Sequence, residues 1–213
     1  MKNYRIFNMY HNKIGGNEMS ENMIKDSGQT REFDTGSHRD MAVGKGRCDL
    51  LPECAVLKVL DCTSEAKDHT VQGHLKEAVR NVMQFKIDIT KQNYLIQAAY
   101  EALVAVGLSE GNTLENADLT STLSCMSIGL LKTSIHYEVG ANKYGENNWK
   151  LGQPMHVLID SGLRHTFKGI SGNDDEPHVR AAAWNYLCAI WTMDNIPNLM
   201  DLPTSGNDKP KKK

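Results

Sequence analysis

The sequence predicts an all-α protein built as a helical bundle. Four long segments repeat apolar residues at helical spacing, whereas strand-type alternation is confined to Phe85, Ile87 and Ile89. That short segment could form a strand, although no partner strand is evident in the sequence. Helices with one apolar face stabilise each other by burying those faces together, so a bundle is the most economical architecture.

Composition and charge exclude several classes of protein. Hydrophobic residues make up 40% of the 213 residues and charged residues 23%, which is typical of a globular domain and excludes a disordered or fibrous chain. The net charge of −2 provides no field for gathering the chain onto duplex nucleic acid or an anionic membrane. No apolar run is long enough to cross a bilayer and no secretory leader is recognisable, so we expect a cytoplasmic protein. The five scattered cysteines predict free thiols.

Domain organisation follows from where the periodic patterns begin and end. Residues 1–31 and the basic tail 201–213 are aperiodic and polar, and we expect both to be flexible. Residues 32–200 then form one all-α domain. Amphipathic patterns run through residues 52–111 and are clearest over 91–106, where the periodicity ends at Gly107. That helix is predicted to be scaffold.

Residues 120–144 form the next predicted helix, in which Glu138 extends an apolar stripe containing Leu131 and Ile135. A buried carboxylate is costly unless it is paired or bound to a cation. Glu138 is therefore a surface residue at the end of the bundle, a member of a buried ion pair, or a metal ligand.

Two further helices are predicted over residues 154–168 and 176–193, each with a proline suited to its first turn. Asp160 and Arg164 lie four residues apart on the first of these helices, a spacing that an ordinary surface ion pair also explains. Asp174 or Asp175 could cap the second helix, which carries His178 and Asn185 away from its apolar stripe. Inward-facing side chains on neighbouring helices are the usual material of a site in a bundle.

Three segments of the chain carry a resemblance to a known family. They are FDTGSHRDMAVGKGRCDLLP (33–52), HYEVGANKYGENNWKLGQP (136–154) and LIDSGLRHTFKGISGNDDEPHVRAAAWNYLCAI (158–190). In this order they resemble the phage and bacterial dATP/dGTP diphosphohydrolase N-terminal domain family, which is similar to the MazG-like all-α pyrophosphohydrolases. Residues 58–119 match nothing in this pattern and are expected to be a helical insertion.

The resemblance implies a fold, a reaction and a set of partners. It implies a MazG-like bundle that converts (d)NTP and water to (d)NMP and pyrophosphate, with purine deoxynucleotides as the substrates. Mg²⁺ or Mn²⁺ is the implied cofactor, a homo-oligomer the implied assembly, and the host cytoplasm the implied location of a phage protein. Oxygen ligands on helices suit these ions.

The resemblance also implies site residues. Together with the clustered acids and bases, it predicts Glu138, Asp160 and Asp175 as metal ligands and Glu138, Asp160 and His178 as catalytic residues. The implied substrate-binding residues are Arg39, Lys45, Arg47, Lys143, Tyr144, Asn148, Trp149, Arg164, His165 and Asn185. Packing within the core is an alternative role for the aromatic residues and for His165.

One departure from the MazG-like pattern leaves two alternatives open. The paired carboxylates of those enzymes, E-x-x-E and E-x-x-D, are absent here: Leu163 follows Asp160, and His178 follows Asp175, at the third position. The chain could therefore be a noncatalytic nucleotide-binding accessory protein, or an oligomeric scaffold.

Overall fold

The computed structural model describes residues 30–40, 43–114 and 119–203. The chain divides into two compact units, Met1–Met41 and Ala42–Lys213. In the first unit, β1 (Thr30–Glu32) pairs antiparallel with β2 (His38–Asp40), with Arg31 opposite Arg39. Most of the two segments expected to be flexible, 1–31 and 201–213, lies outside the described residues.

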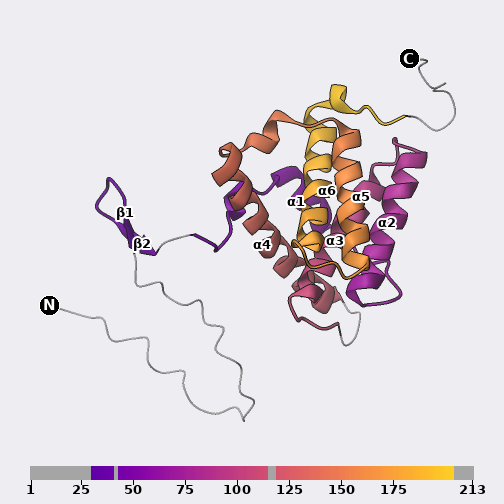
Figure 1. Ribbon diagram of the computed structural model, residues 1–213, viewed down its shortest axis with the longest axis horizontal. Helices are drawn as coiled ribbons and strands as arrows, with labels where there is room; N and C mark the ends of the chain where they lie inside the picture. The colour runs from indigo at the N-terminus through magenta and orange to yellow at the C-terminus, as the bar shows by residue number, and fades with distance from the viewer. Residues whose placement is uncertain (1–29, 41–42, 115–118, 204–213) are drawn as a thin grey trace, which may run out of the picture. The chain divides into compact units, whose positions relative to one another are not determined.

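The described part of the second unit is helical, which confirms the predicted all-α bundle (Figure 1). Its α-helices are α1 (Glu53–Leu60), α2 (Val71–Ile87), α3 (Asn93–Ser109), α4 (Leu119–Tyr144), α5 (Met155–Ile170) and α6 (His178–Asn195). Short 3-10 helices occupy Cys48–Leu50, Asn148–Leu151 and Pro197–Leu199. The four helices expected over residues 91–106, 120–144, 154–168 and 176–193 correspond to α3 to α6, with ends shifted by up to three residues.

The strand considered for residues 85–89 is wrong, because Phe85 and Ile87 form the last turn of α2. In a helix these two side chains point in nearly opposite directions, so Phe85 is buried while Ile87 is 59% exposed. The helix begins where the Thr70 hydroxyl accepts a hydrogen bond from the Gly73 amide at 3.0 Å. Alternation over so few residues did not distinguish a strand from the end of an amphipathic helix.

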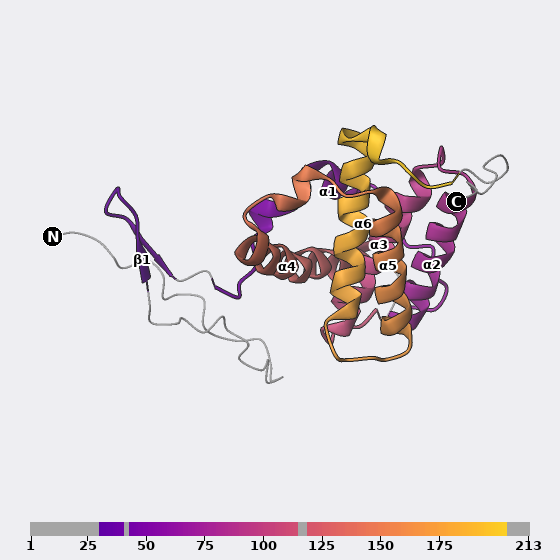
Figure 2. The ribbon, with the colours of Figure 1, turned by 45° about the horizontal axis from the view of Figure 1, so that its top comes forward.

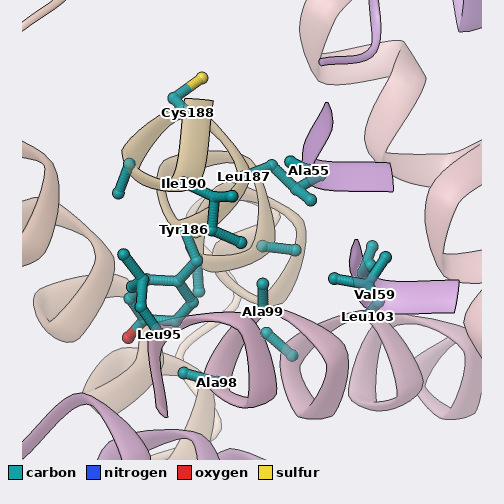
Figure 3. Packing of buried hydrophobic residues seen from close by; sticks show 14 of the residues in the cluster. Ala55, Val59, Leu95, Ala98, Ala99, Leu103, Tyr186, Leu187, Cys188 and Ile190 are labelled. Atoms are coloured by element: carbon teal, nitrogen blue, oxygen red, sulfur yellow. The ribbon is translucent and has the colours of Figure 1, made fainter. Parts of the chain in front are cut away.

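The core lies where α3 and α6 face each other (Figure 3). Ala98, Ala99 and Leu103 of α3 pack in the same cluster as Tyr186 and Leu187 of α6. Every residue of α3 from 98 to 107 is buried. The segment expected to be an insertion, 58–119, thus contributes a helix to the core of the bundle.

Two close approaches of backbone hold α3 against α4. A Cβ atom at Gly107 would overlap the carbonyl group of Cys125, and one at Gly129 would overlap the carbonyl group of Leu103. Each helix therefore places a glycine against the backbone of the other: Gly107 of α3 lies against α4, and Gly129 of α4 lies against α3. This reciprocal contact sets how closely α4 approaches the core.

Helices α5 and α6 lie side by side and are joined at one end by residues 171–177, while α4 packs against α3 and α6 (Figure 2). Met155, Leu158, Ile159 and Leu163 are buried, as the apolar stripe of α5 predicted. The acidic connection before α6 does not cap that helix as expected, because no side chain bonds its first backbone amides.

All five cysteines are free thiols, as predicted. Among the described residues, no helix is both long enough and apolar enough to span a bilayer.

Candidate functional site

Two histidines and a glutamate meet where α5 ends and α6 begins. His165 lies in the last turns of α5, and His178 is the first residue of α6. Their Nδ1 atoms are 3.0 Å apart. Glu176, in the connection, places Oε1 at 3.6 Å from Nδ1 of His165 and 3.4 Å from Nδ1 of His178. Three donor atoms from neighbouring elements therefore surround one point.

A carboxylate fixes the orientation of the His178 ring. Nε2 of His178 lies 2.7 Å from Oδ1 of Asp175, and the ring itself is 2% exposed. Since an ionised carboxylate only accepts, Nε2 of His178 donates to Asp175, and Nδ1 of the same ring faces the cluster. Lys168 donates to the other Asp175 oxygen at 3.2 Å.

The surroundings of the cluster shift the pKa values of His165, of the nearby His136 and of Asp175. Burial lowers the pKa of His165, the charge of Glu176 opposes this shift, and the positive charges of Arg164 and Lys168 add to it. Burial also lowers the pKa of His136 on α4, as does the positive charge of Arg180. Hydrogen bonds from His178 and Lys168 lower the pKa of Asp175. Neutral imidazole is the form that binds cations.

A cavity of about 550 Å³ lies beside the cluster. Residues at the end of α3, in the connection and at the start of α6 line it: Ser109, Glu110, Gly169, Asn173, Asp174, Asp175, Glu176, Pro177, His178, Val179 and Arg180. Its lining includes four acids and one arginine. An anionic ligand would bind there only together with cations.

Glu138 is buried, as its place in an apolar stripe suggested, but the reason differs. Leu131 of the same stripe is 49% exposed, so the stripe does not face the core along its whole length. Glu138 is covered by the 43–47 loop: its Oε1 accepts a hydrogen bond from the Gly44 amide at 2.8 Å, and Oε2 accepts one from the Gly46 amide at 2.7 Å. Two backbone amides of this loop therefore bind the Glu138 carboxylate.

Both glycines of this loop have backbone angles that other residues rarely adopt. The φ angles are +78° at Gly44 and +84° at Gly46. This conformation turns the two amides toward the same acceptor and makes an anion-binding concavity. The GKG sequence and Glu138 therefore form one structural unit across more than ninety residues of chain.

The basic residues of the same loop have different environments. Arg47 donates to Asp49 at 2.8 and 2.7 Å and to Glu146 at 2.7 Å. These two carboxylates raise the pKa of Arg47 above its ordinary value. Lys45 is exposed. These bonds use three of the five N–H groups of Arg47, so two remain for a further acceptor such as phosphate.

Asp160 and Arg164 lie on the exposed face of α5. Their side chains are 72% and 57% exposed, and Arg164 donates to Asp160 at 3.2 Å. Neither residue lines the cavity. The geometry matches the surface ion pair that their spacing also allowed.

The aromatic candidates separate into buried and exposed residues. Trp149 is buried and meets Tyr137 and Trp191 edge to face at 5.7 and 5.2 Å. Tyr144 is 61% exposed, with the Lys143 ammonium 4.8 Å from its ring centroid. Trp149 is thus part of the packing at this end of α4, whereas Tyr144 is open to a ligand.

Three further candidates have the following surroundings. Asn185 is buried and donates to the Ala181 carbonyl at 2.8 Å. Asn148 is half-buried in the 3-10 helix after α4. Arg39 lies in β2 of the first unit, whose position relative to the bundle is not defined.

The structure brings together His165, Asp175 and His178 from the predicted set, and adds Glu176 and Arg180. Glu176 was not among the site residues predicted from the sequence. The sequence signal that could have identified Glu176 is its position two residues before His178, with Pro177 between them. In the structure both side chains lie close to His165.

Comparison with known proteins agrees with the resemblance. No curated protein and no solved structure matches the chain. A family model does match residues 109–202, which run from the end of α3 past α6 and include the second and third of the resembling segments. The family's description supports a nucleotide hydrolase. Over residues 109–202 the chain matches the dATP/dGTP diphosphohydrolase, N-terminal, family, as the sequence predicted.

Proposed function

We propose that the protein is a divalent-metal-dependent diphosphohydrolase that converts purine deoxynucleoside triphosphates to monophosphates and pyrophosphate. The observation that carries the proposal is the meeting of His165, Asp175 and His178 beside a cavity, within the region that matches the family. A cavity of about 550 Å³ is large enough for a nucleotide.

The charge of the cavity supports a metal requirement. Glu110, Asp174, Asp175 and Glu176 line it, and Arg180 is the cation among its lining residues. The negative charge of these carboxylates would repel a triphosphate unless divalent ions lay between the carboxylate oxygens and the phosphate oxygens. Carboxylate oxygens are the donors that Mg²⁺ and Mn²⁺ prefer, so the lining fits these ions. When bound, such an ion neutralises charge on the phosphates and polarises the bond that breaks.

We assign roles to the chain's own residues on this basis. Asp175 orients His178 through Nε2, so that Nδ1 is available to a water molecule or a cation. Arg180 would contact phosphate oxygens at the cavity. Glu138 acts as a positioning residue that holds the 43–47 loop with Lys45, rather than as a ligand at the cavity. Tyr144 is the exposed aromatic residue of the candidate set but does not line the cavity, so it is given no role in this site.

Variants at the cavity test whether the reaction takes place there. We expect Asp175→Asn and Arg180→Gln each to lower kcat/KM for dGTP at least tenfold, since each removes a charge that faces the cavity. Asp88→Asn, at the exposed end of α2, is the matched control and is expected to keep full turnover. Unchanged kinetics in both cavity variants would place the reaction elsewhere.

The principal alternative is a nucleotide-binding protein without catalysis, suggested by the missing paired carboxylates. Calorimetry separates the two functions. Tight binding of dATP or dGTP with no product in Mg²⁺ or Mn²⁺ would establish the binding protein, and release of pyrophosphate would exclude it.

A further inference from the structure

We infer that His165, Glu176 and His178 form a resident site for a nitrogen-preferring first-row metal ion of the Zn²⁺ type, distinct from the Mg²⁺ or Mn²⁺ that accompanies a nucleotide. The site joins the end of α5 to the start of α6 and borders the cavity. It goes beyond the proposed function because it requires neither nucleotide nor turnover.

The spacing of the three donor atoms supports the site. The two Nδ1 atoms are 3.0 Å apart, and Oε1 of Glu176 lies 3.4 and 3.6 Å from them. An ion about 2.1 Å from each donor, in tetrahedral or octahedral geometry, requires donors about 3.0 to 3.4 Å apart. Two of the three separations fall in this range, and the 3.6 Å separation is slightly longer. The 3.0 Å separation of the two nitrogens is also that of a hydrogen bond, whereas the two separations to Glu176 are long for one.

The second layer of contacts prepares His178 for a metal. Asp175 accepts from Nε2 of His178 at 2.7 Å, which leaves the lone pair of Nδ1 directed at Glu176 and His165. A metal-binding histidine commonly donates its other ring nitrogen to a carboxylate in this way. The nearly complete burial of His178 holds the ring in place.

The donor types select the ion. Imidazole nitrogens suit Zn²⁺, Fe²⁺, Co²⁺ and Ni²⁺, whereas Mg²⁺ prefers a shell made only of oxygens. Two imidazoles and one carboxylate provide three protein ligands, and three is the number that leaves a coordination position open for water or substrate. Glu176 is 48% exposed at its side chain and lines the cavity, so the open position would face the ligand.

Direct metal binding by the full chain tests this inference. The protein is stripped with a chelator, dialysed, and titrated with Co²⁺ alone while its visible d–d absorption is recorded, followed by competition with Zn²⁺. We expect about one Co²⁺ per chain in a site of fewer than six ligands, displaced by Zn²⁺ and not by Mg²⁺ at equal concentration.

Variants locate the ion. His165→Gln and Glu176→Gln are expected to lower Co²⁺ affinity at least a hundredfold, and Asp175→Asn ten- to a hundredfold because it only orients His178. His156→Gln is the matched control, since His156 is an exposed histidine of α5 that bonds Asp201. It should bind Co²⁺ as the wild type does. Circular dichroism confirms that each variant is folded. A further variant, His178→Gln, replaces the buried ligand. If it does not fold, His165→Gln and Glu176→Gln, at partly exposed positions, still test whether Co²⁺ binds at this site.

Histidine ¹⁵N spectra provide a second readout. On addition of Zn²⁺, we expect the Nδ1 resonances of His165 and His178 to shift, with Nε2 of His178 remaining protonated. A Co²⁺ spectrum identical to that of the free aqueous ion, or bands that persist in His165→Gln and Glu176→Gln, would overturn the site. Hydrolysis of dNTP without Co²⁺ binding would overturn the metal site alone, and Co²⁺ binding without hydrolysis would overturn the proposed function alone.

Discussion

The carboxylate of Glu138 accepts a hydrogen bond from the backbone amide of Gly46 at 2.7 Å, joining two residues that lie 92 positions apart. The Gly44 amide binds the other oxygen. Glu138 therefore attaches the loop before α1 to the last turns of α4. The two glycines and the glutamate depend on each other, because the amides converge only at positive φ and the carboxylate is buried only under the loop.

Replacing Glu138 by Gln tests this attachment. Glutamine offers one oxygen to two amide donors and turns an NH₂ group toward one of them. We expect the free energy of unfolding to fall by about 1–3 kcal/mol while the chain remains folded, and turnover to fall at least tenfold because the loop with Lys45 is released. Urea denaturation and steady-state kinetics measure the two effects. Full stability would show that the loop is held by other contacts, and full activity would remove Glu138 from any role in the reaction.

The glycine contact between α3 and α4 gives a prediction with an internal control. Gly129→Ala places a methyl group against the Leu103 carbonyl, so we expect a loss of stability of about 2 kcal/mol or more. Gly140→Ala lies on the same helix with open space around the new methyl group, and it should add up to about 1 kcal/mol. Thermal unfolding of both variants compares them directly. Equal effects would contradict the close helix contact.

A buried polar network provides the third prediction. Glu101 and His74 are both 0% exposed and lie 2.6 Å apart, and Glu101 also accepts from the Glu65 amide at 2.7 Å. These bonds attach the loop before α2 to α3. Glu101→Ala leaves the donors unpaired in the core, and we expect a cost on the order of 3–5 kcal/mol. Glu53→Ala, at the start of α1, should cost less than about 1 kcal/mol because its side chain is 70% exposed. A cost for Glu101→Ala near that of Glu53→Ala in urea denaturation would show that the network is unimportant.

The lowered pKa of His136 predicts how stability depends on pH. Burial is the main cause, followed by the charges of Arg180 and His165, with Glu176 acting in the opposite direction. Between the folded pKa and the ordinary value of 6.5, the unfolded chain binds more protons than the folded one, so stability falls as the pH falls through this window. Urea denaturation in chelator at pH 7.5 and 5.5 should show a smaller loss for His136→Gln than for the wild type. The same loss in both proteins would contradict this account.

The helices of this fold could be predicted because their signals are local. The apolar periodicity of α5 and the proline before it placed its start within one residue of Met155. Local signals could not predict that residues 58–119 belong to the core. This segment contains α3, and the burial of α3 depends on which helices surround it. Almost all of its faces are apolar, a pattern that indicates a central helix once the segment is treated as part of the bundle.

The site was predictable only in part, for a related reason. His165 and His178 were found through their motifs, but their meeting depends on the turn at residues 171–177. Asp160 was predicted as a site residue, but its spacing from Arg164 fitted a surface ion pair as well as a site, and the two residues form such a pair. The partners of Glu138 came from a loop more than ninety residues away, and no periodicity connects such positions.

The most direct test of the proposed function identifies the products. The purified chain is incubated with dATP, dGTP, dCTP and dTTP in Mg²⁺ or Mn²⁺, and the products are separated by anion-exchange chromatography. We predict deoxynucleoside monophosphate and pyrophosphate in equal amounts, formed fastest from dATP or dGTP and absent when metal is removed. Release of nucleoside and triphosphate, or no product with any nucleotide and metal, would contradict the account.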